Sequence, residues 1–351
     1  MNRPFKILII RLSSLGDILH ALPAFFDLRH TYPDAKIDWL AANNTSFLLS
    51  AVRGINRVHI FDKTALLDIT SKPGRSHSLW QLIRDLRKEH YDYCIDFQGL
   101  LKTAFLGFLS GASLRIGFPD NLVREKPAHW FYNKTPVIRK EPQHVLNLNR
   151  KLAGCIGARS SSFVFDPILP DQDLHHVKSI IKDNGLSEFV ILNPGGGWVS
   201  KIWRSEYYGK LAAEIRDRLG FQTVVTTGPG EDALFDGLAA HCSGPPPIHI
   251  RISFLQMIPL LKKARLLIGG DTGPFHLACA LRTPVVGIFG PTSAIRNGPW
   301  SNRDEVVTNG VACSGCHKRN CPTDNACMDI PVSDVFAAVE RRLAKSGTKP
   351  I

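Results

Sequence analysis

The chain has 351 residues, which is long enough for two domains that each bury a hydrophobic core. With 44% hydrophobic and 21% charged residues, and with 28 Gly and 23 Pro spread along it, the composition is globular and excludes a disordered or fibrous chain. The net charge of +12 is concentrated in residues 1–165, which carry 23 basic and 13 acidic side chains against 20 and 18 in residues 166–351.

The basic first half predicts an anionic partner such as an acidic membrane surface or a phosphorylated substrate, with a merely solvated surface as the alternative. Nucleic acid is not expected, because the chain has no basic run with interleaved aromatics and no zinc-finger or recognition-helix signature. No apolar run approaches the roughly 20 residues of a membrane span. Lys6 and Arg11 interrupt the first apolar stretch, so no signal peptide is expected. These features predict a cytoplasmic protein.

In the first half, short apolar runs alternate with helical patterns, which is typical of a parallel sheet covered by helices on both faces. The expected strands are residues 6–10, 37–41, 58–61, 93–97 and 114–117. The expected helices are residues 18–30, 45–52, 78–89, 100–109 and 142–154.

A serine- and proline-bearing segment, residues 160–171, is expected to link the domains, with the boundary at residue 165. A second βα series follows. Its expected strands are 189–193, 223–227, 248–250, 266–269 and 285–289, and its expected helices are 205–219, 232–241, 254–264 and 274–281. We expect a second domain over residues 166–335 and a last amphipathic helix over 332–346, which could pack back on the first domain. The two βα series therefore predict two doubly wound domains that face a central cleft.

Ligands bind beyond the carboxyl ends of the strands in such sheets, so the loops after strands are the candidate sites. Asp17 follows the first strand and is either a helix cap or a general base mounted on a rigid element. Three glycines and Lys201 follow the strand at 189–193. They predict a backbone phosphate site with a mobile cation, or else a flexible loop with a solvated lysine.

Two further loops of the second half carry polar residues. Glu231 could bind ribose hydroxyls or complement the dipole of the next helix. In the sequence 269–276, Pro274 fits a first helical turn, and Thr272 and Gly273 would expose N–H groups to an anion such as a diphosphate. An aspartic protease is excluded, because only one Asp-Thr-Gly is present and it lies at a strand-to-helix junction.

Three motifs occur in order along the chain: SSLGDILH (13–20), DFQGLLK (96–102) and DTGPFHLA (271–278). Together they closely resemble the ADP-heptose:lipopolysaccharide heptosyltransferases, and the segments 198–203 and 290–292 fit the same family. The matches span residues 7 to about 330. The segments 117–118, 124–125, 131–133 and 144–145 resemble heptosyltransferase I more than heptosyltransferase II.

The resemblance implies an α/β GT-B fold and inverting transfer of heptose from ADP-heptose to the Kdo of Kdo-lipid A, at the cytoplasmic surface of the inner membrane. It implies no metal or other cofactor for the chemistry. The implied catalytic residues are Asp17, the general base, and Lys201, which binds the diphosphate. The implied nucleotide-sugar residues are Gly16, Gly196, Gly197, Glu231, Asp271, Thr272, Gly273 and His276. The implied acceptor residues are Ser14, Gln98, Lys102, Arg124 and His144.

Four of the eight cysteines are clustered, at Cys313, Cys316, Cys321 and Cys327. Their spacing predicts a structural Zn or Fe site, with unpaired or disulfide-bonded thiols as the alternative. Because the cluster lies far along the chain from the candidate catalytic loops, its loss is expected to lower stability more than it changes the chemistry. The other cysteines, Cys94, Cys155, Cys242 and Cys279, are expected to be buried apolar residues.

Two other functions remain open at this stage. One is a related transferase that uses another acceptor, including a protein, or another nucleotide sugar. The other is a non-catalytic module that binds a nucleotide sugar, which the presence of both Asp17 and Lys201 disfavours.

Overall fold

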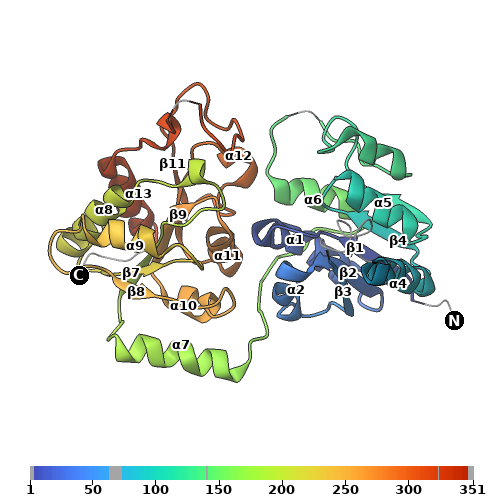
Figure 1. The fold of residues 1–351 in the computed structure, drawn as a ribbon, viewed down its shortest axis with the longest axis horizontal. Coiled ribbons are helices and arrows are strands. Elements are labelled where there is room, and N and C mark those ends of the chain that lie inside the picture. The colour runs from blue at the N-terminus through green and yellow to red at the C-terminus, as the bar shows by residue number, and fades with distance from the viewer. Residues whose placement is uncertain (1–3, 63–72, 140, 323, 347–351) are drawn as a thin grey trace. The chain divides into compact units, whose positions relative to one another are not determined.

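The computed structural model describes residues 4–62, 73–139, 141–322 and 324–346 (Figure 1). The chain divides into two compact units, Met1–Ile168 and Leu169–Ile351. Each unit contains one parallel β-sheet with helices packed against it.

The first unit has a five-stranded sheet in the order β3-β2-β1-β4-β5. Its strands are β1 (Lys6–Ile10), β2 (Lys36–Ala42), β3 (Arg57–Phe61), β4 (Tyr93–Asp96) and β5 (Leu114–Ile116). Its helices are α1 (Leu15–Thr31), α2 (Asn43–Ser50), α4 (Pro73–Glu89), α5 (Leu101–Leu109), the 3-10 helix η1 (Lys126–Phe131) and α6 (Val145–Gly154).

The second unit has a six-stranded sheet in the order β11-β10-β9-β6-β7-β8. Its strands are β6 (Phe189–Asn193), β7 (Gln222–Thr226), β8 (Ile248–Ile250), β9 (Leu266–Gly270), β10 (Val285–Ile288) and β11 (Glu305–Val307). Its helices are α7 (Asp171–Asp183), α8 (Ser205–Leu219), α9 (Asp232–Ala239), α10 (Met257–Lys263), α11 (Gly273–Leu281), α12 (Ala294–Asn297) and α13 (Val332–Ala344), with η2 (Val199–Lys201) and η3 (Ala326–Met328) as 3-10 turns.

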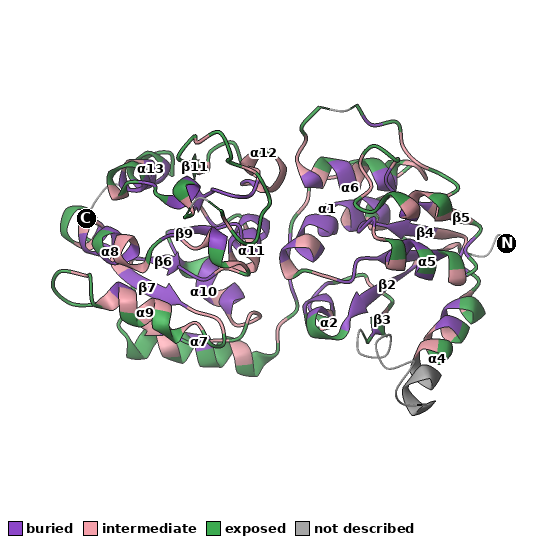
Figure 2. Cartoon of the chain, turned by 45° about the horizontal axis from the view of Figure 1, so that its top comes forward, coloured by how far each residue is buried: buried purple, intermediate pink, exposed green. Residues whose placement is uncertain are grey.

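The central strands are continuously apolar because helices cover both faces of each sheet. Every residue of β6 and β9 is buried, as are the last four of β1 (Figure 2). Cys94 and Cys279 are buried as expected, whereas Cys155 and Cys242 are only partly buried.

Helix α7 was not expected from the sequence. It begins at Asp171, where the sequence predicted the linker to end, and Val177 is its only buried residue (Figure 2). Its apolar residues Leu174, Val177, Ile180 and Ile181 recur at helical spacing, a signal that the sequence reasoning missed. Helix α13 buries its apolar face, including Val335, Phe336 and Val339, in the core of the second unit. The expected packing of this helix on the first domain stays a prediction.

Both sheets have a point where the strand order reverses, between β1 and β4 and between β6 and β9. The loops that follow these four strands diverge there, which creates the usual ligand crevice of doubly wound folds. These loops carry Asp17, Gln98, Lys201 and Asp271. Within the described residues, no helix is both long and apolar enough to span a bilayer.

Candidate active site

In the second unit, Lys201 and Asp271 meet where the strand order reverses. The Lys201 Nζ lies 3.0 Å from the Asp271 carboxylate and 3.1 Å from its carbonyl oxygen. A 2.7 Å hydrogen bond joins His276 Nε2 to Asp271 Oδ1, and Asn297 donates to Oδ2 at 3.2 Å. Burial alone would raise the pKa of Asp271, but His276 and Lys201 together hold that pKa well below its usual range. Asp271 is therefore a fixed anion that orients the lysine.

The N-terminus of α11 adjoins this ion pair. Thr272 is the N-cap, its hydroxyl accepts from the Phe275 N–H, and the same hydroxyl donates to Asn193 Oδ1 at 3.2 Å. Gly273 and Pro274 form the start of the first turn. Pro274 has no N–H and the Phe275 N–H is capped by Thr272, so Gly273 is the first-turn residue whose N–H has no intrahelical acceptor. The partial positive charge of the helix start and this backbone donor lie beside the Lys201 ammonium, an arrangement that suits a phosphate.

Glu231 joins the glycine loops that follow β6 and β7. Its carboxylate accepts from the N–H of Gly228 at 2.7 Å and of Gly196 at 3.3 Å. A Cβ on Gly195 would lie 2.3 Å from a Glu231 oxygen, so only glycine permits this approach. At Gly197, in contrast, an added Cβ would meet nothing within 4 Å. Glu231 occupies the N-cap position of α9, where its charge can complement the helix dipole although its side chain makes no capping hydrogen bond, and its binding of ribose stays a prediction.

The cysteine-bearing loop packs against the same site. The Ser200 hydroxyl donates to the Lys318 carbonyl at 2.9 Å, and the Arg319 guanidinium lies 5.3 Å from the centre of the Trp198 ring. The cysteine-bearing loop, although distant in sequence, is therefore in contact with the loop of Lys201, and the expectation that loss of the cysteines lowers stability more than it changes the chemistry stays a prediction. Distance along the chain gave no information about this contact, which depends on how two loops pack.

The structure does not assemble a finished metal site from these cysteines. Among the described residues, no three His, Cys, Asp or Glu side chains are arranged to hold a metal ion. Burial and the charges of Cys313, Cys321 and Cys316 raise the pKa of Cys327. Thiolates are donors that Zn and Fe accept, and the metal site at the four cysteines stays a prediction.

In the first unit, Asp17 serves the helix start and also pairs with a buried arginine. Its Oδ2 accepts from the Ser14 N–H at 2.9 Å and from the Ser14 hydroxyl at 3.1 Å, while Oδ1 lies 2.5 Å from Arg11 Nη2. Burial would raise the pKa of Asp17, but Arg11 and the Ser14 N–H hold the pKa well below its usual range. Ser14 is the N-cap of α1, so Asp17 is the N3 residue of a capping box, and its carboxylate is ionised at neutral pH.

The loop after β4 supports this segment. Gln98 is buried and its side-chain oxygen accepts from the Leu12 N–H at 2.8 Å, which fixes the chain just before the Asp17 loop. Asp96, for which the sequence suggested no role, is also buried. It accepts from the Gln98 N–H and the Tyr132 hydroxyl, at 2.8 and 2.7 Å. Burial raises the pKa of Asp96 against the effect of these hydrogen bonds.

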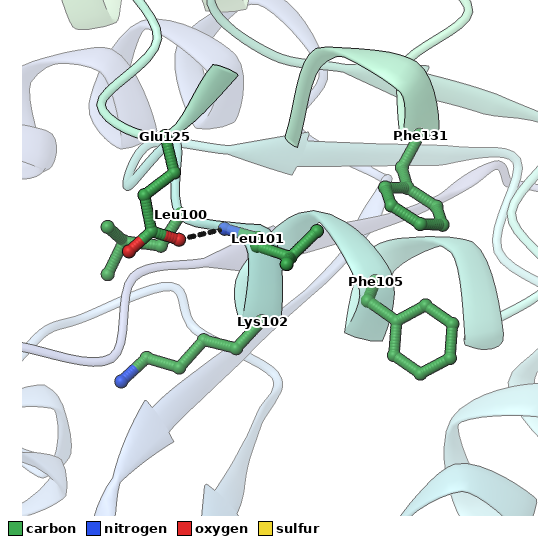
Figure 3. A pocket seen from close by; sticks show the side chains of 6 residues that line it. All are labelled: Leu100, Leu101, Lys102, Phe105, Glu125 and Phe131. Atoms are coloured by element: carbon green, nitrogen blue, oxygen red, sulfur yellow. Dashed lines mark hydrogen bonds between the residues drawn. The ribbon is translucent and has the colours of Figure 1, made fainter. Parts of the chain in front are cut away.

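The other expected acceptor residues lie around the start of α5 and of α6. Lys102 lines an open cavity of about 580 Å³, together with Leu100, Leu101, Phe105, Glu125 and Phe131 (Figure 3). The Glu125 carboxylate accepts from the Leu101 N–H at 2.7 Å, and the exposed Arg124 donates its backbone N–H to Gly99. His144 caps α6, and its ring packs edge-on against His20, one helical turn after Asp17, with 5.8 Å between ring centres.

The profile of glycosyltransferase family 9 (heptosyltransferase) matches residues 79–327, more than half of the chain. The chain belongs to this family. It is 27% identical to lipopolysaccharide heptosyltransferase 1 of Pseudomonas aeruginosa, with 90% of this chain and 87% of that protein covered. It is also 27% identical to a lipopolysaccharide heptosyltransferase 3 of Escherichia coli, with 95% and 98% covered.

Solved structures show the fold of this family 9 glycosyltransferase. The structure of the E. coli heptosyltransferase WaaC with ADP matches with a TM-score of 0.74 over 96% of this chain and 100% of that one, at 22% identity. This confirms the GT-B class that the sequence motifs implied.

Within each unit the structure brings several of the predicted site residues together. Lys201, Asp271 and His276 are in direct contact, with Thr272 next to them, and Gly196 contacts Glu231. Sequence reasoning missed Arg11, Asp96 and Arg319. Asp96 stands in a quoted motif and could have been suspected, because a carboxylate at the end of a buried strand needs partners.

Proposed function

We propose that this family 9 glycosyltransferase moves heptose from ADP-heptose, with inversion, to the Kdo of a Kdo-lipid A acceptor. The observation that carries the proposal is the Lys201–Asp271–His276 group beside the N-terminus of α11, which offers a cation, a backbone N–H and the helix dipole to a leaving diphosphate. The names of the two relatives, lipopolysaccharide heptosyltransferases 1 and 3, support a lipopolysaccharide acceptor.

On the donor side, negative charge grows on the diphosphate as the bond between the anomeric carbon and its oxygen breaks. The Lys201 ammonium and the Gly273 N–H at the start of α11 stabilise that charge, and the lysine needs no reorganisation because Asp271 already holds it. Donors fixed before the reaction contribute more to the transition state than mobile ones.

On the acceptor side, an acceptor hydroxyl attacks the anomeric carbon opposite the diphosphate. A carbon–oxygen bond forms, ADP leaves, and the hydroxyl proton passes to the Asp17 carboxylate. Arg11 keeps that carboxylate ionised at neutral pH, so it is ready to accept the proton, although its low pKa makes it a weak base. Transfer therefore requires that the proton move late, when the attacking oxygen has become acidic.

We further propose that the first unit works at the cytoplasmic surface of the inner membrane. Helix α5 is apolar on both sides, because Leu101, Phe105 and Phe108 form an exposed stripe opposite its buried face. These side chains are 41–47% exposed, and Trp130 of η1 is 80% exposed. The basic side chains of this region are Lys102, Arg115, Arg124, Lys126 and Lys134. Aromatic side chains among lysines and arginines are typical of surfaces that enter the headgroup region of anionic bilayers.

Vesicle sedimentation tests this surface. We expect the chain to sediment with phosphatidylcholine vesicles that contain phosphatidylglycerol, and much less with phosphatidylcholine alone. The double variant Phe105→Ser/Phe108→Ser should lose most of this binding. Phe47→Ser, which removes an exposed phenylalanine from α2, is the matched control and should bind as the wild type does. Equal loss in both variants would argue against a specific surface.

A second acceptor is favoured by one observation. The relatives at 27% identity include heptosyltransferase 3 as well as heptosyltransferase 1, so a lipopolysaccharide acceptor other than Kdo-lipid A is the runner-up. Parallel assays with ADP-heptose and either Kdo-lipid A or a heptosylated core separate the two. Transfer to Kdo-lipid A alone supports the proposal, and transfer only to the heptosylated core replaces it.

A further inference from the structure

The indole ring of Trp198 has two cations near it in the second unit. The Lys201 Nζ lies 4.4 Å from the ring centre and the Arg319 Cζ lies 5.3 Å from it. Both distances are within the range of a cation–π contact. Lys201 and Trp198 belong to the loop after β6, whereas Arg319 comes from the cysteine-bearing loop over 100 residues later.

A further cation would strengthen the candidate diphosphate site. Lys201 is paired with Asp271, and Glu231 adds a second carboxylate to the same group of loops. A dianion bound beside Lys201 would therefore have two carboxylates nearby, and an additional guanidinium would offset their charge. Arg319 is exposed and has no carboxylate partner in the described part of the chain, so its charge is available to a ligand.

The segment that carries Arg319 is held against the site by backbone contacts. The Gly315 N–H donates to the Gly290 carbonyl at 2.9 Å, and the His317 N–H to the Pro291 carbonyl at 2.7 Å. The Lys318 carbonyl accepts from the buried Ser200 hydroxyl, next to Lys201. These bonds fix the chain on both sides of Cys316, so the approach of Arg319 to Trp198 is part of a packed interface between two loops.

We propose that Arg319 is a further diphosphate-binding residue of this transferase, presented to the donor site by the cysteine-bearing loop. The Trp198 ring restrains the guanidinium through its face and leaves the N–H groups at its edge free to donate. A planar guanidinium can give two parallel hydrogen bonds to one phosphate group, which an ammonium cannot do. The inference rests on the proposed use of an ADP-sugar.

Calorimetric titration with ADP tests the inference. Arg319→Ala should raise the Kd for ADP by roughly tenfold or more, because a charge-assisted hydrogen bond to the diphosphate is lost. Arg319→Lys should recover part of the loss, since it keeps the charge without the bidentate geometry. Lys318→Ala is the matched control and should bind ADP as the wild type does, because only the backbone carbonyl of Lys318 contacts the site.

Adenosine distinguishes a phosphate contact from a general effect on the loop. Its binding, followed by ligand-observed NMR, should be the same for wild type and Arg319→Ala, because adenosine carries no phosphate. Equal weakening of ADP and adenosine would mean that Arg319 only supports Trp198, and would overturn the inference. A change of less than twofold for ADP would overturn it as well, and would leave the proposed function standing. A folded wild-type chain that does not bind ADP would refute both.

Discussion

Replacing Asp17 by asparagine is the sharpest test of catalysis, but the structure shows that the substitution does two things at once. The new amide oxygen could still accept from the Ser14 N–H, so the capping box survives. The neutral amide could not balance the charge of Arg11, whose side chain is only 5% exposed. Leaving a buried charged group without its partner costs about 3–5 kcal/mol, and the lower part of that range is expected because the Asp17 side chain is 32% exposed.

We therefore expect Asp17→Asn to lose about 10²- to 10⁴-fold in kcat, the usual contribution of a general base, and also to unfold at lower denaturant concentration. The double variant Arg11→Met/Asp17→Asn removes both charges and separates the two effects. The double variant should be more stable than Asp17→Asn, although it also loses the hydrogen bond from Arg11 to the Phe97 carbonyl. Its turnover should stay as low as that of Asp17→Asn. The assay is ADP release under saturating substrates, with urea unfolding measured on the same preparations. Near wild-type kcat in the double variant would refute the role of Asp17 as the base.

Three other predictions concern the donor site, the free energy of unfolding at acidic pH, and the cysteines. Lys201→Ala should lower kcat/KM for ADP-heptose by at least 10²-fold, and unchanged steady-state kinetics would remove Lys201 from the site. Glu89, whose pKa is lowered to about 2 mainly by its hydrogen bond from Lys36, should add at most about 3 kcal/mol to the free energy of unfolding. That contribution should be complete above about pH 5 and vanish as the pH falls towards 2, and Glu89→Gln should abolish this part of the pH dependence in urea titrations. Elemental analysis of protein purified without chelator should find about one Zn or Fe per chain, and a metal-free preparation of full stability would exclude the site.

The cysteine prediction changes in one respect once the loop contacts are known. The cysteine-bearing loop contacts Ser200 and Trp198, so removal of the metal or of Cys313 should weaken ADP binding as well as lower stability. Chelation that lowers the unfolding temperature but leaves the Kd for ADP unchanged would show that the loop keeps its position without the metal.

The sequence predicted those parts of the fold whose signal is local. Strand β6 is a continuous apolar run, and its bounds were predicted residue for residue. Helix α7 was missed although Leu174, Val177 and Ile181 recur at helical spacing in its sequence. Helix α13 was predicted as a helix but without its partner, because periodicity identifies an apolar face and not the surface that covers it.

In the candidate site, too, some contacts could be predicted from the sequence and others could not. Lys201 and Asp271 could be assigned to one site because each follows a strand, and the two strands are neighbours where the sheet order reverses. The contacts of Arg11 with Asp17 and of Arg319 with Trp198 could not be predicted. The Arg11–Asp17 contact depends on the conformation of a buried arginine side chain, and the Arg319–Trp198 contact joins two loops that are far apart in the chain. The spacing of residues in the sequence predicts neither contact.

The central claim is that this chain transfers heptose from ADP-heptose to a Kdo-bearing lipid. The most direct measurement incubates purified protein with Kdo-lipid A and one nucleotide sugar at a time, and follows nucleotide release together with the mass of the lipid. The account predicts release of ADP and a lipid heavier by one heptose with ADP-heptose, and neither product with UDP- or GDP-sugars or when the acceptor is omitted. A folded protein that leaves the lipid unmodified with ADP-heptose, or that modifies it equally well from a UDP-sugar, would contradict the account.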